Sequence, residues 1–137
     1  MANTWSGVVG VALLVCLPCI ANAQSGGEDV RKRHVNCAAV LGVAGAYSAD
    51  KELQEKLLAA AELLGLWASE LITNQPTEAR TDQTARELLD QAIAIRRTIK
   101  VKAGTPAATK EFEEKYGSAQ KACEAWFLAE MKKRKGG

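Results

Sequence analysis

The chain has 137 residues, of which 25% are charged, and its formal net charge is +2. A chain of this length is typical of one domain with a single hydrophobic core. Many nucleic-acid-binding proteins are strongly basic, whereas the charge of this chain is nearly balanced. We therefore expect no nucleic-acid partner. Aromatic residues make up only 5% of the chain, whereas Ala, Leu, Glu and Lys are abundant. This composition predicts an all-α fold.

The N-terminal segment has the composition of an export signal. Residues 1–23 contain no Asp, Glu, Lys or Arg and include a largely apolar run. That run of about 14 residues is shorter than the roughly 20 that span a bilayer. Small residues precede Gln24, as signal peptidase prefers. We therefore predict a cleaved signal peptide over 1–23, with cleavage between Ala23 and Gln24, and a periplasmic or secreted protein without a stable membrane anchor.

One feature of this segment leaves an alternative open. A signal peptide usually carries Lys or Arg near its start, and this one has neither. The alternative is an uncleaved anchor that lies in the membrane interface. Lipid attachment at Cys16 or Cys19 is disfavoured, because Val15 and Pro18 stand where bacterial lipoprotein signals carry a small residue.

The remainder of the chain divides into three parts. Residues 24–29 contain Gly and Ser and predict a flexible lead-in. Residues 30–131 contain four amphipathic segments joined by short loops, which predict one helical domain. The last part, 132–137, begins with four consecutive basic residues and predicts a basic disordered tail. Whether the tail binds an anionic surface stays open.

The segment 53–71 carries the clearest helical pattern. Its apolar residues recur at intervals of three and four, the spacing of a stripe that packs along neighbouring helices. This stripe consists of Leu53, Leu57, Ala60, Leu64, Trp67 and Leu71. A second stripe beside it predicts contact with two neighbours. We expect Ser48 or Asp50 to cap this helix and the residues before Pro76 to end it.

Three further helices are predicted from similar stripes. The first spans about 30–47 and has small residues grouped at Ala38, Gly42 and Gly45, which would allow close approach of another helix. The third begins between Thr77 and Asp82, and the fourth begins after Gly104. Their stripes are Ala85, Leu88, Ala92, Ile95 and Ile99, and then Phe112, Tyr116, Ala119, Cys123 and Trp126. The simplest arrangement is an up-down-up-down four-helix bundle, with Trp67 and Trp126 both buried.

Two cysteines lie on these apolar stripes. Cys37 falls near the start of the first predicted helix and Cys123 near the end of the fourth. Those ends lie at the same level in an up-down-up-down bundle, and the heights of the two cysteines along the bundle axis differ by roughly 5 Å. Export also delivers a chain to a compartment where disulfides persist. We therefore predict a disulfide between Cys37 and Cys123; two buried free thiols are the alternative for a protein that is not exported.

His34 is the only histidine and lies one turn before Cys37. Together they supply two of the roughly four ligands that zinc needs, so a half-buried, hydrogen-bonded imidazole is the preferred interpretation. Haem held by His34 and Met131 is the alternative, because both residues fall at the same end of the predicted bundle. We expect no cofactor, no metal site and no catalytic residues, since the chain has no recognisable catalytic or phosphate-binding pattern.

These observations indicate a non-enzymatic exported protein that binds an unidentified protein partner. The layout, an export signal followed by helices tied by one disulfide, resembles two bacterial groups: periplasmic immunity proteins, which neutralise a toxin, and periplasmic acid-stress chaperones. The resemblance is one of layout and implies no site residue. It implies either one tight stoichiometric complex or weak binding to many unfolded proteins at low pH. A carrier of a ligand in the helical core is the alternative function.

Overall fold

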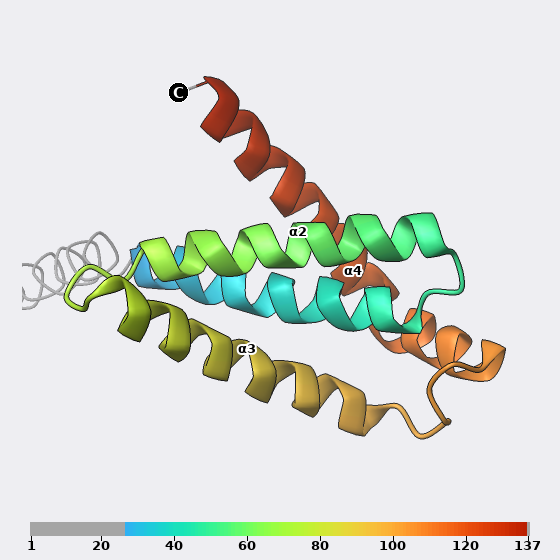
Figure 1. Cartoon of the computed structure of the whole chain (residues 1–137). Coiled ribbons are helices and arrows are strands. Elements are labelled where there is room, and N and C mark those ends of the chain that lie inside the picture. Colours follow the sequence, from blue (N-terminus) through green and yellow to red (C-terminus); the bar gives the residue numbers. More distant parts are fainter. Residues whose placement is uncertain (1–26, 137) are drawn as a thin grey trace, which may run out of the picture.

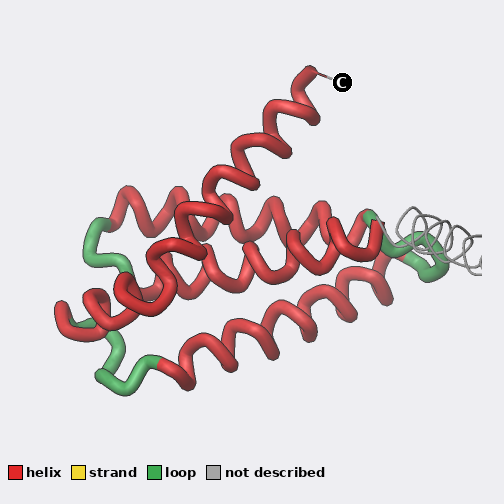
Figure 2. The backbone as a smooth tube through the Cα atoms, turned by 180° about the vertical axis from the view of Figure 1, so that it is seen from behind, coloured by secondary structure: helices red, strands yellow, loops and turns green. Residues whose placement is uncertain are grey.

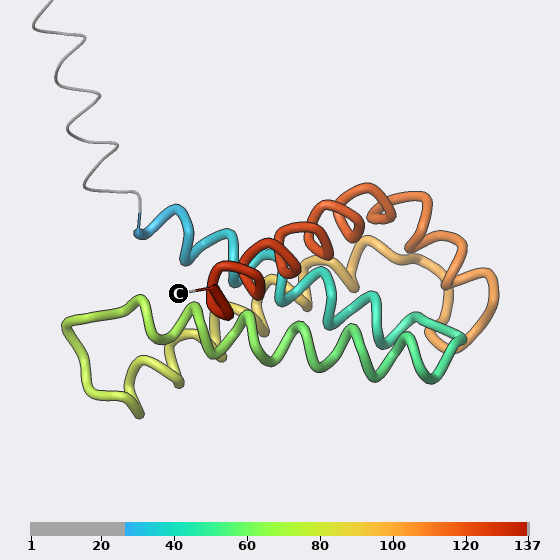
Figure 3. The backbone as a smooth tube through the Cα atoms, turned by 90° about the horizontal axis from the view of Figure 1, so that it is seen from above, coloured from blue at the N-terminus to red at the C-terminus, as the bar shows by residue number. Residues whose placement is uncertain are grey.

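The computed structural model describes residues 27–136, and all its regular structure is helical. An N-terminal helix covers 27–47, followed by α2 (Lys51–Glu70), α3 (Thr77–Thr98) and α4 (Pro106–Gly136). The N-terminal helix, α2 and α3 lie side by side and alternate in direction, whereas α4 crosses them obliquely and its last turns project outward (Figures 1 and 2). The view from above shows α4 passing over the other helices (Figure 3). Within residues 27–136, the prediction of four helices without strands is confirmed.

Local sequence explains where α2 and α4 begin. The Asp50 carboxylate accepts hydrogen bonds from the backbone N–H groups of Glu52 (3.0 Å) and Leu53 (3.4 Å), so it is the N-cap of α2. Gly104 has φ +86°, a left-handed conformation that glycine adopts without steric cost. The Thr105 hydroxyl then caps α4 by accepting from the Ala108 N–H at 3.2 Å. The Asp50 cap is one of the two that the sequence predicts for α2.

The most buried element is the N-terminal helix and not the segment 53–71. Most residues from 34 to 47 are buried, including Val35 and Leu41, which are fully enclosed. The small residues on this helix explain how α2 packs against it. A Cβ atom added at Gly45 would lie 3.2 Å from the Leu58 side chain and 3.4 Å from the Gln54 carbonyl oxygen. Only glycine fits this contact without a shift, so the predicted close approach of helices is confirmed.

The other apolar stripes are buried only in part. Leu57, Ala60, Leu64 and Trp67 of α2 are buried, but Leu53 and Leu71 at its two ends are exposed. In α3 Ile95 is buried and Ala85 is exposed, and Ile99, directly after α3, is buried. In α4 Phe112 and Cys123 are buried, Ala119 is exposed and Trp126 is only half-buried. An oblique helix contacts its neighbours over a limited length. The tilt of α4 therefore explains why fewer residues of its own apolar stripe are buried than the spacing of that stripe predicts.

Two segments that we expected outside the helices are helical. Residues 27–29 belong to the N-terminal helix, where the Glu28 carboxylate pairs with Arg31 at 3.0 Å. The predicted disordered tail is also incorrect up to Gly136, since α4 includes Lys132–Lys135. Basic side chains in the last turn interact favourably with the helix dipole, which supports continuation of this helix. The predicted signal peptide, Cys16 and Cys19 lie outside the described residues.

A carboxylate joins α4 to the end of α3. Glu111 accepts hydrogen bonds from the backbone N–H groups of Lys100 (3.0 Å) and Val101 (3.2 Å) and from the Lys115 ammonium (2.9 Å). These donors lower the pKa of Glu111 to about 2. The Thr98 hydroxyl and the Tyr116 hydroxyl are also hydrogen-bonded at 2.8 Å. The first turns of α4 are thereby attached to α3.

Within residues 27–136, none of the helices combines the length and the apolar character needed to cross a bilayer.

Candidate functional site

A disulfide joins the middle of α4 to the N-terminal helix. The sulfur atoms of Cys37 and Cys123 are 2.14 Å apart and the Cα atoms are 5.1 Å apart. Both residues are buried. The two cysteines that the sequence pairs are therefore at bonding distance. This bond attaches α4 at one point to the most buried helix of the protein.

His34 lies in an aromatic cluster next to the disulfide. Its side chain is 1% exposed, and its ring centroid lies 6.2 Å from that of Trp67 and 5.7 Å from that of Trp126. The Trp126 indole N–H donates a hydrogen bond to Nδ1 of His34 at 3.0 Å. The imidazole is therefore hydrogen-bonded as predicted, but it is fully buried rather than half-buried. Trp67 also stacks on Phe127 of α4, with centroids 5.7 Å apart.

Several charged groups surround this cluster. The Arg33 guanidinium lies 4.2 Å from the Trp126 ring centroid, and the Arg134 guanidinium lies at the same distance from the Trp67 ring. Arg134 also reaches Glu70 of α2 at 3.5 Å. Burial lowers the pKa of His34 below its ordinary value of 6.5, with the charge of Arg134 acting in the same direction and that of Glu130 opposing it. The neutral imidazole is the favoured form.

This geometry bears on the two ligand-binding interpretations of His34. A cysteine in a disulfide has no thiolate to offer a metal, so Cys37 and His34 do not form a pair of zinc ligands in this structure. Within residues 27–136, no three His, Cys, Asp or Glu side chains are grouped as metal ligands. Haem ligation by His34 Nδ1 would require Trp126 to give up its hydrogen bond. Met131 is half-buried at the edge of the core.

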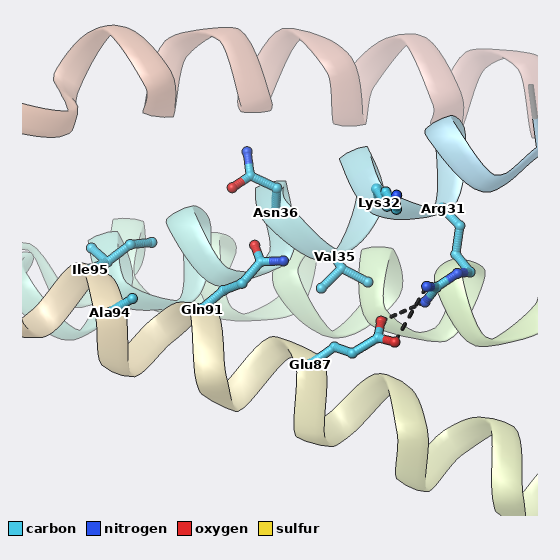
Figure 4. A pocket seen from close by; sticks show the side chains of 8 residues that line it. All are labelled: Arg31, Lys32, Val35, Asn36, Glu87, Gln91, Ala94 and Ile95. Atoms are coloured by element: carbon cyan, nitrogen blue, oxygen red, sulfur yellow. Dashed lines mark hydrogen bonds and ion pairs between the residues drawn. The ribbon is translucent and has the colours of Figure 1, made fainter. Parts of the chain in front are cut away.

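An ion pair fastens the N-terminal helix to α3 beside a cavity of about 580 Å³. The buried Arg31 guanidinium contacts the Glu87 carboxylate, with N–O distances of 2.6 and 3.3 Å, and it also binds Glu28. Figure 4 shows Arg31 and Glu87 facing each other at one end of this cavity. Arg31 lowers the pKa of both carboxyl groups. The sequence does not indicate this contact, because residues 56 positions apart give no local signal.

A second cavity, which we call the apolar groove, lies between α2 and α4. It has a volume of about 470 Å³ and its floor is the fully buried Leu41. Leu53 on α2 and Leu128 on α4 stand at its rims with exposed fractions of 38% and 66%. Lys56 and Glu124 are the charged residues among those that line it. The complete lining is Leu41, Leu53, Lys56, Leu57, Ala59, Ala60, Leu63, Glu124, Phe127 and Leu128.

The sequence indicates the residues on the α2 side of the groove but not Leu128 on the α4 side. The apolar stripe of α2 identifies Leu53, Leu57 and Ala60 as residues that face a neighbouring helix. Leu128 lies beside the predicted stripe of α4, and nothing in the sequence indicates that it borders a cavity. Because α4 diverges from α2, side chains that would meet in a parallel bundle leave an open apolar channel.

Comparison of this chain with protein-family models, with curated proteins and with solved structures gives no match.

Proposed function

We propose that this is an exported helical protein without catalytic activity, and that it binds an apolar segment of another polypeptide in the apolar groove. In the proposed form the signal peptide has been removed, and the four helices constitute an up-down-up-down bundle whose last helix is tilted. The observation that carries the proposal is the groove itself, with Leu53 and Leu128 exposed at its rims. Exposed apolar surface in a hollow is typical of protein-binding sites.

The charges at the groove favour a partner of neutral, apolar character. Lys56 already pairs with Glu52 at 2.9 Å, and Glu124 contacts the amide of Gln120 at 3.5 Å. Their charges are of opposite sign, so the lining carries no net charge that would select a strongly charged ligand. The remaining lining residues are apolar, so burial of leucine-like side chains would supply most of the binding free energy.

Carriage of a ligand such as haem is the alternative, and we favour it less. The proposed axial ligand His34 is 1% exposed and already accepts a hydrogen bond from Trp126. Absorbance in the Soret region of protein purified from its own host distinguishes a carrier from a protein-binding module.

Substitution of Leu128 by Glu tests the groove. We expect L128E to weaken binding of a permanently unfolded client, reduced and alkylated α-lactalbumin, by at least about tenfold, since a carboxylate would be buried without a partner. Fluorescence anisotropy of the labelled client measures the Kd. The matched control is L89E on α3: Leu89 is 57% exposed but does not line the groove. Equal affinities for L128E, L89E and the unsubstituted protein would refute the groove as the binding site.

L128E and its control L89E also test the groove if the partner is one specific protein. An immunity-like function predicts a single stoichiometric complex in the exported fraction of the host, seen by native mass spectrometry and lost in L128E. A chaperone-like function predicts weak binding to many unfolded proteins instead. The number of partners and the Kd therefore separate the two versions of the proposal.

Export is tested by the intact mass of the protein from its own host. We expect a chain that begins at Gln24 and is lighter, by the two hydrogens that a disulfide removes, than the fully reduced form. Mass spectrometry before and after reduction provides the comparison. A full-length chain with four free thiols in the cytosol would contradict both the export and the oxidation that we propose.

A further inference from the structure

The geometry points to a pH-dependent latch: protonation of His34 releases the part of α4 that follows Cys123 and widens the apolar groove. The inference rests on the proposed function, because it concerns access to the same groove. We call residues 124–136 the distal segment of α4, and we call His34, Trp67, Trp126, Phe127 and Arg134 the aromatic latch.

The two ends of α4 are held in different ways. Before Cys123, the helix is attached by the Glu111 contacts, by the Thr109 hydroxyl, which donates to the Tyr47 carbonyl oxygen at 2.6 Å, and by Phe112 stacked on Tyr47. The disulfide follows. Among the described residues, the hydrogen bond, the ring contacts and the ion pair between the distal segment and the other helices are those of the aromatic latch, and Met131 adds an apolar contact with the core. Loosening of the latch would therefore move the distal segment about the fixed point at Cys123.

The hydrogen bond at the centre of the latch requires neutral His34. Nδ1 accepts the proton of the Trp126 indole N–H, so in this state it carries no hydrogen of its own. When Nδ1 takes up a proton from water, it becomes a hydrogen-bond donor. The N–H group of His34 Nδ1 and the indole N–H of Trp126 then point at each other. An indole N–H has no lone pair with which to accept a hydrogen bond. Protonation thus replaces an attractive contact by a repulsive one where the distal segment of α4 meets the N-terminal helix.

The charges near the ring also oppose an imidazolium ion in the closed state. Arg33 on the same helix lies over Trp126, and Arg134 of α4 lies over Trp67. Arg31 is neutralised by Glu28 and by Glu87 of α3, and Glu70 of α2 pairs with Arg134. Glu130 of α4 is the carboxylate that opposes the effect, but it also pairs with Lys133 at 3.5 Å. A protonated ring is better accommodated once it reaches water.

The direction of the pH dependence follows from these contacts. The pKa of His34 in the closed state is below 6.5, whereas the ring has its ordinary pKa when the latch is open. The open state therefore binds more protons between these two values. The latch is at full strength above about pH 6.5 and weakens as the pH falls toward the pKa of the closed state. Opening would expose Trp67 and Phe127 beside the groove, so client binding should increase in acid.

Hydrogen exchange measured by NMR on the exported, oxidised protein tests the latch without any client. Between about pH 7.5 and about pH 4.5 we expect exchange in the distal segment, corrected for intrinsic rates, to rise several-fold, while residues 109–122 change little. The indole N–H of Trp126, identified by its absence in W126F, should lose protection over the same range. If hydrogen exchange increased uniformly along α4 in acid, or did not increase, the inference would be overturned. This outcome does not depend on purifying any variant.

The matched variant is His34→Asn. The Asn Oδ1 atom occupies a position close to that of Nδ1 and can accept from Trp126, but it does not titrate in this range. We expect H34N to keep the distal segment protected at both pH values, and the same pH response in H34N and the unsubstituted protein would contradict the latch. Because this experiment contains no client, its failure leaves the L128E test at neutral pH intact. Loss of client binding at every pH, with a working latch, would instead refute the proposed function.

Discussion

Removal of the Cys37–Cys123 bond lowers the midpoint of thermal unfolding by roughly 15–20 °C. The two cysteines are separated by 86 residues, so the bond closes a loop that includes most of the helical domain. The chain-entropy model assigns to such a loop about 4–5 kcal/mol of stability, because the unfolded chain gains freedom when the link is broken. Proteins of this size have only about 5–15 kcal/mol in total, so this loss is large.

Circular dichroism at 222 nm during heating measures this effect. The double variant C37S/C123S should melt at the temperature of the reduced protein and should not respond to a reducing agent. Each single variant also lacks the bond, so its melting temperature should be close to that of the double variant. Equal melting temperatures for the oxidised and reduced protein would show that the link contributes no net stability.

Leu64→Ala lowers the free energy of unfolding by about 2–5 kcal/mol. Leu64 is fully buried in the core beside the N-terminal helix, and truncation leaves a cavity in addition to the lost burial. The matched control is Leu66→Ala on the same helix. Leu66 is 54% exposed, so its truncation should cost about 0.5 kcal/mol or less.

Urea denaturation of the oxidised variants measures both values. The same substitution in the same helix has the same effect on helix propensity, so the difference between L64A and L66A reports burial alone. If the two variants lost similar free energy, α2 would not present Leu64 to the core, and the arrangement of helices would be incorrect.

Local sequence predicts several features of this fold because short-range physics decides them. Asp50 caps α2 through hydrogen bonds to residues two and three positions away, and Gly104 with Thr105 begins α4 in the same local manner. The apolar spacing of α2 identifies Leu57, Leu64 and other core residues, since a helix has a fixed period. The pairing of Cys37 with Cys123 could also be predicted, because helix lengths and alternating directions bring only certain levels together.

The angle of α4 could not be predicted from its sequence. An apolar stripe states which face of a helix is buried but not over what length, and that length depends on the crossing angle with its neighbours. The angle leaves Leu53 and Leu128 exposed along the groove and leaves Trp126 half-buried. It also explains why Ala119, on the predicted stripe, is in contact with solvent.

By itself, the sequence determined the helical class, the approximate positions of the helices, the Asp50 cap of α2 and the two cysteines on core-facing stripes. Those properties depend on contacts within a few residues or on one period repeated along a helix. Only the tertiary structure decided that Trp126 donates to His34 across 92 positions, that Arg31 binds Glu87, and that α2 and α4 enclose the apolar groove. The physical reason is that each of these contacts depends on how whole helices are oriented relative to one another. A change of a few degrees in the tilt of α4 would alter the His34–Trp126 contact and the groove without any change in the local pattern.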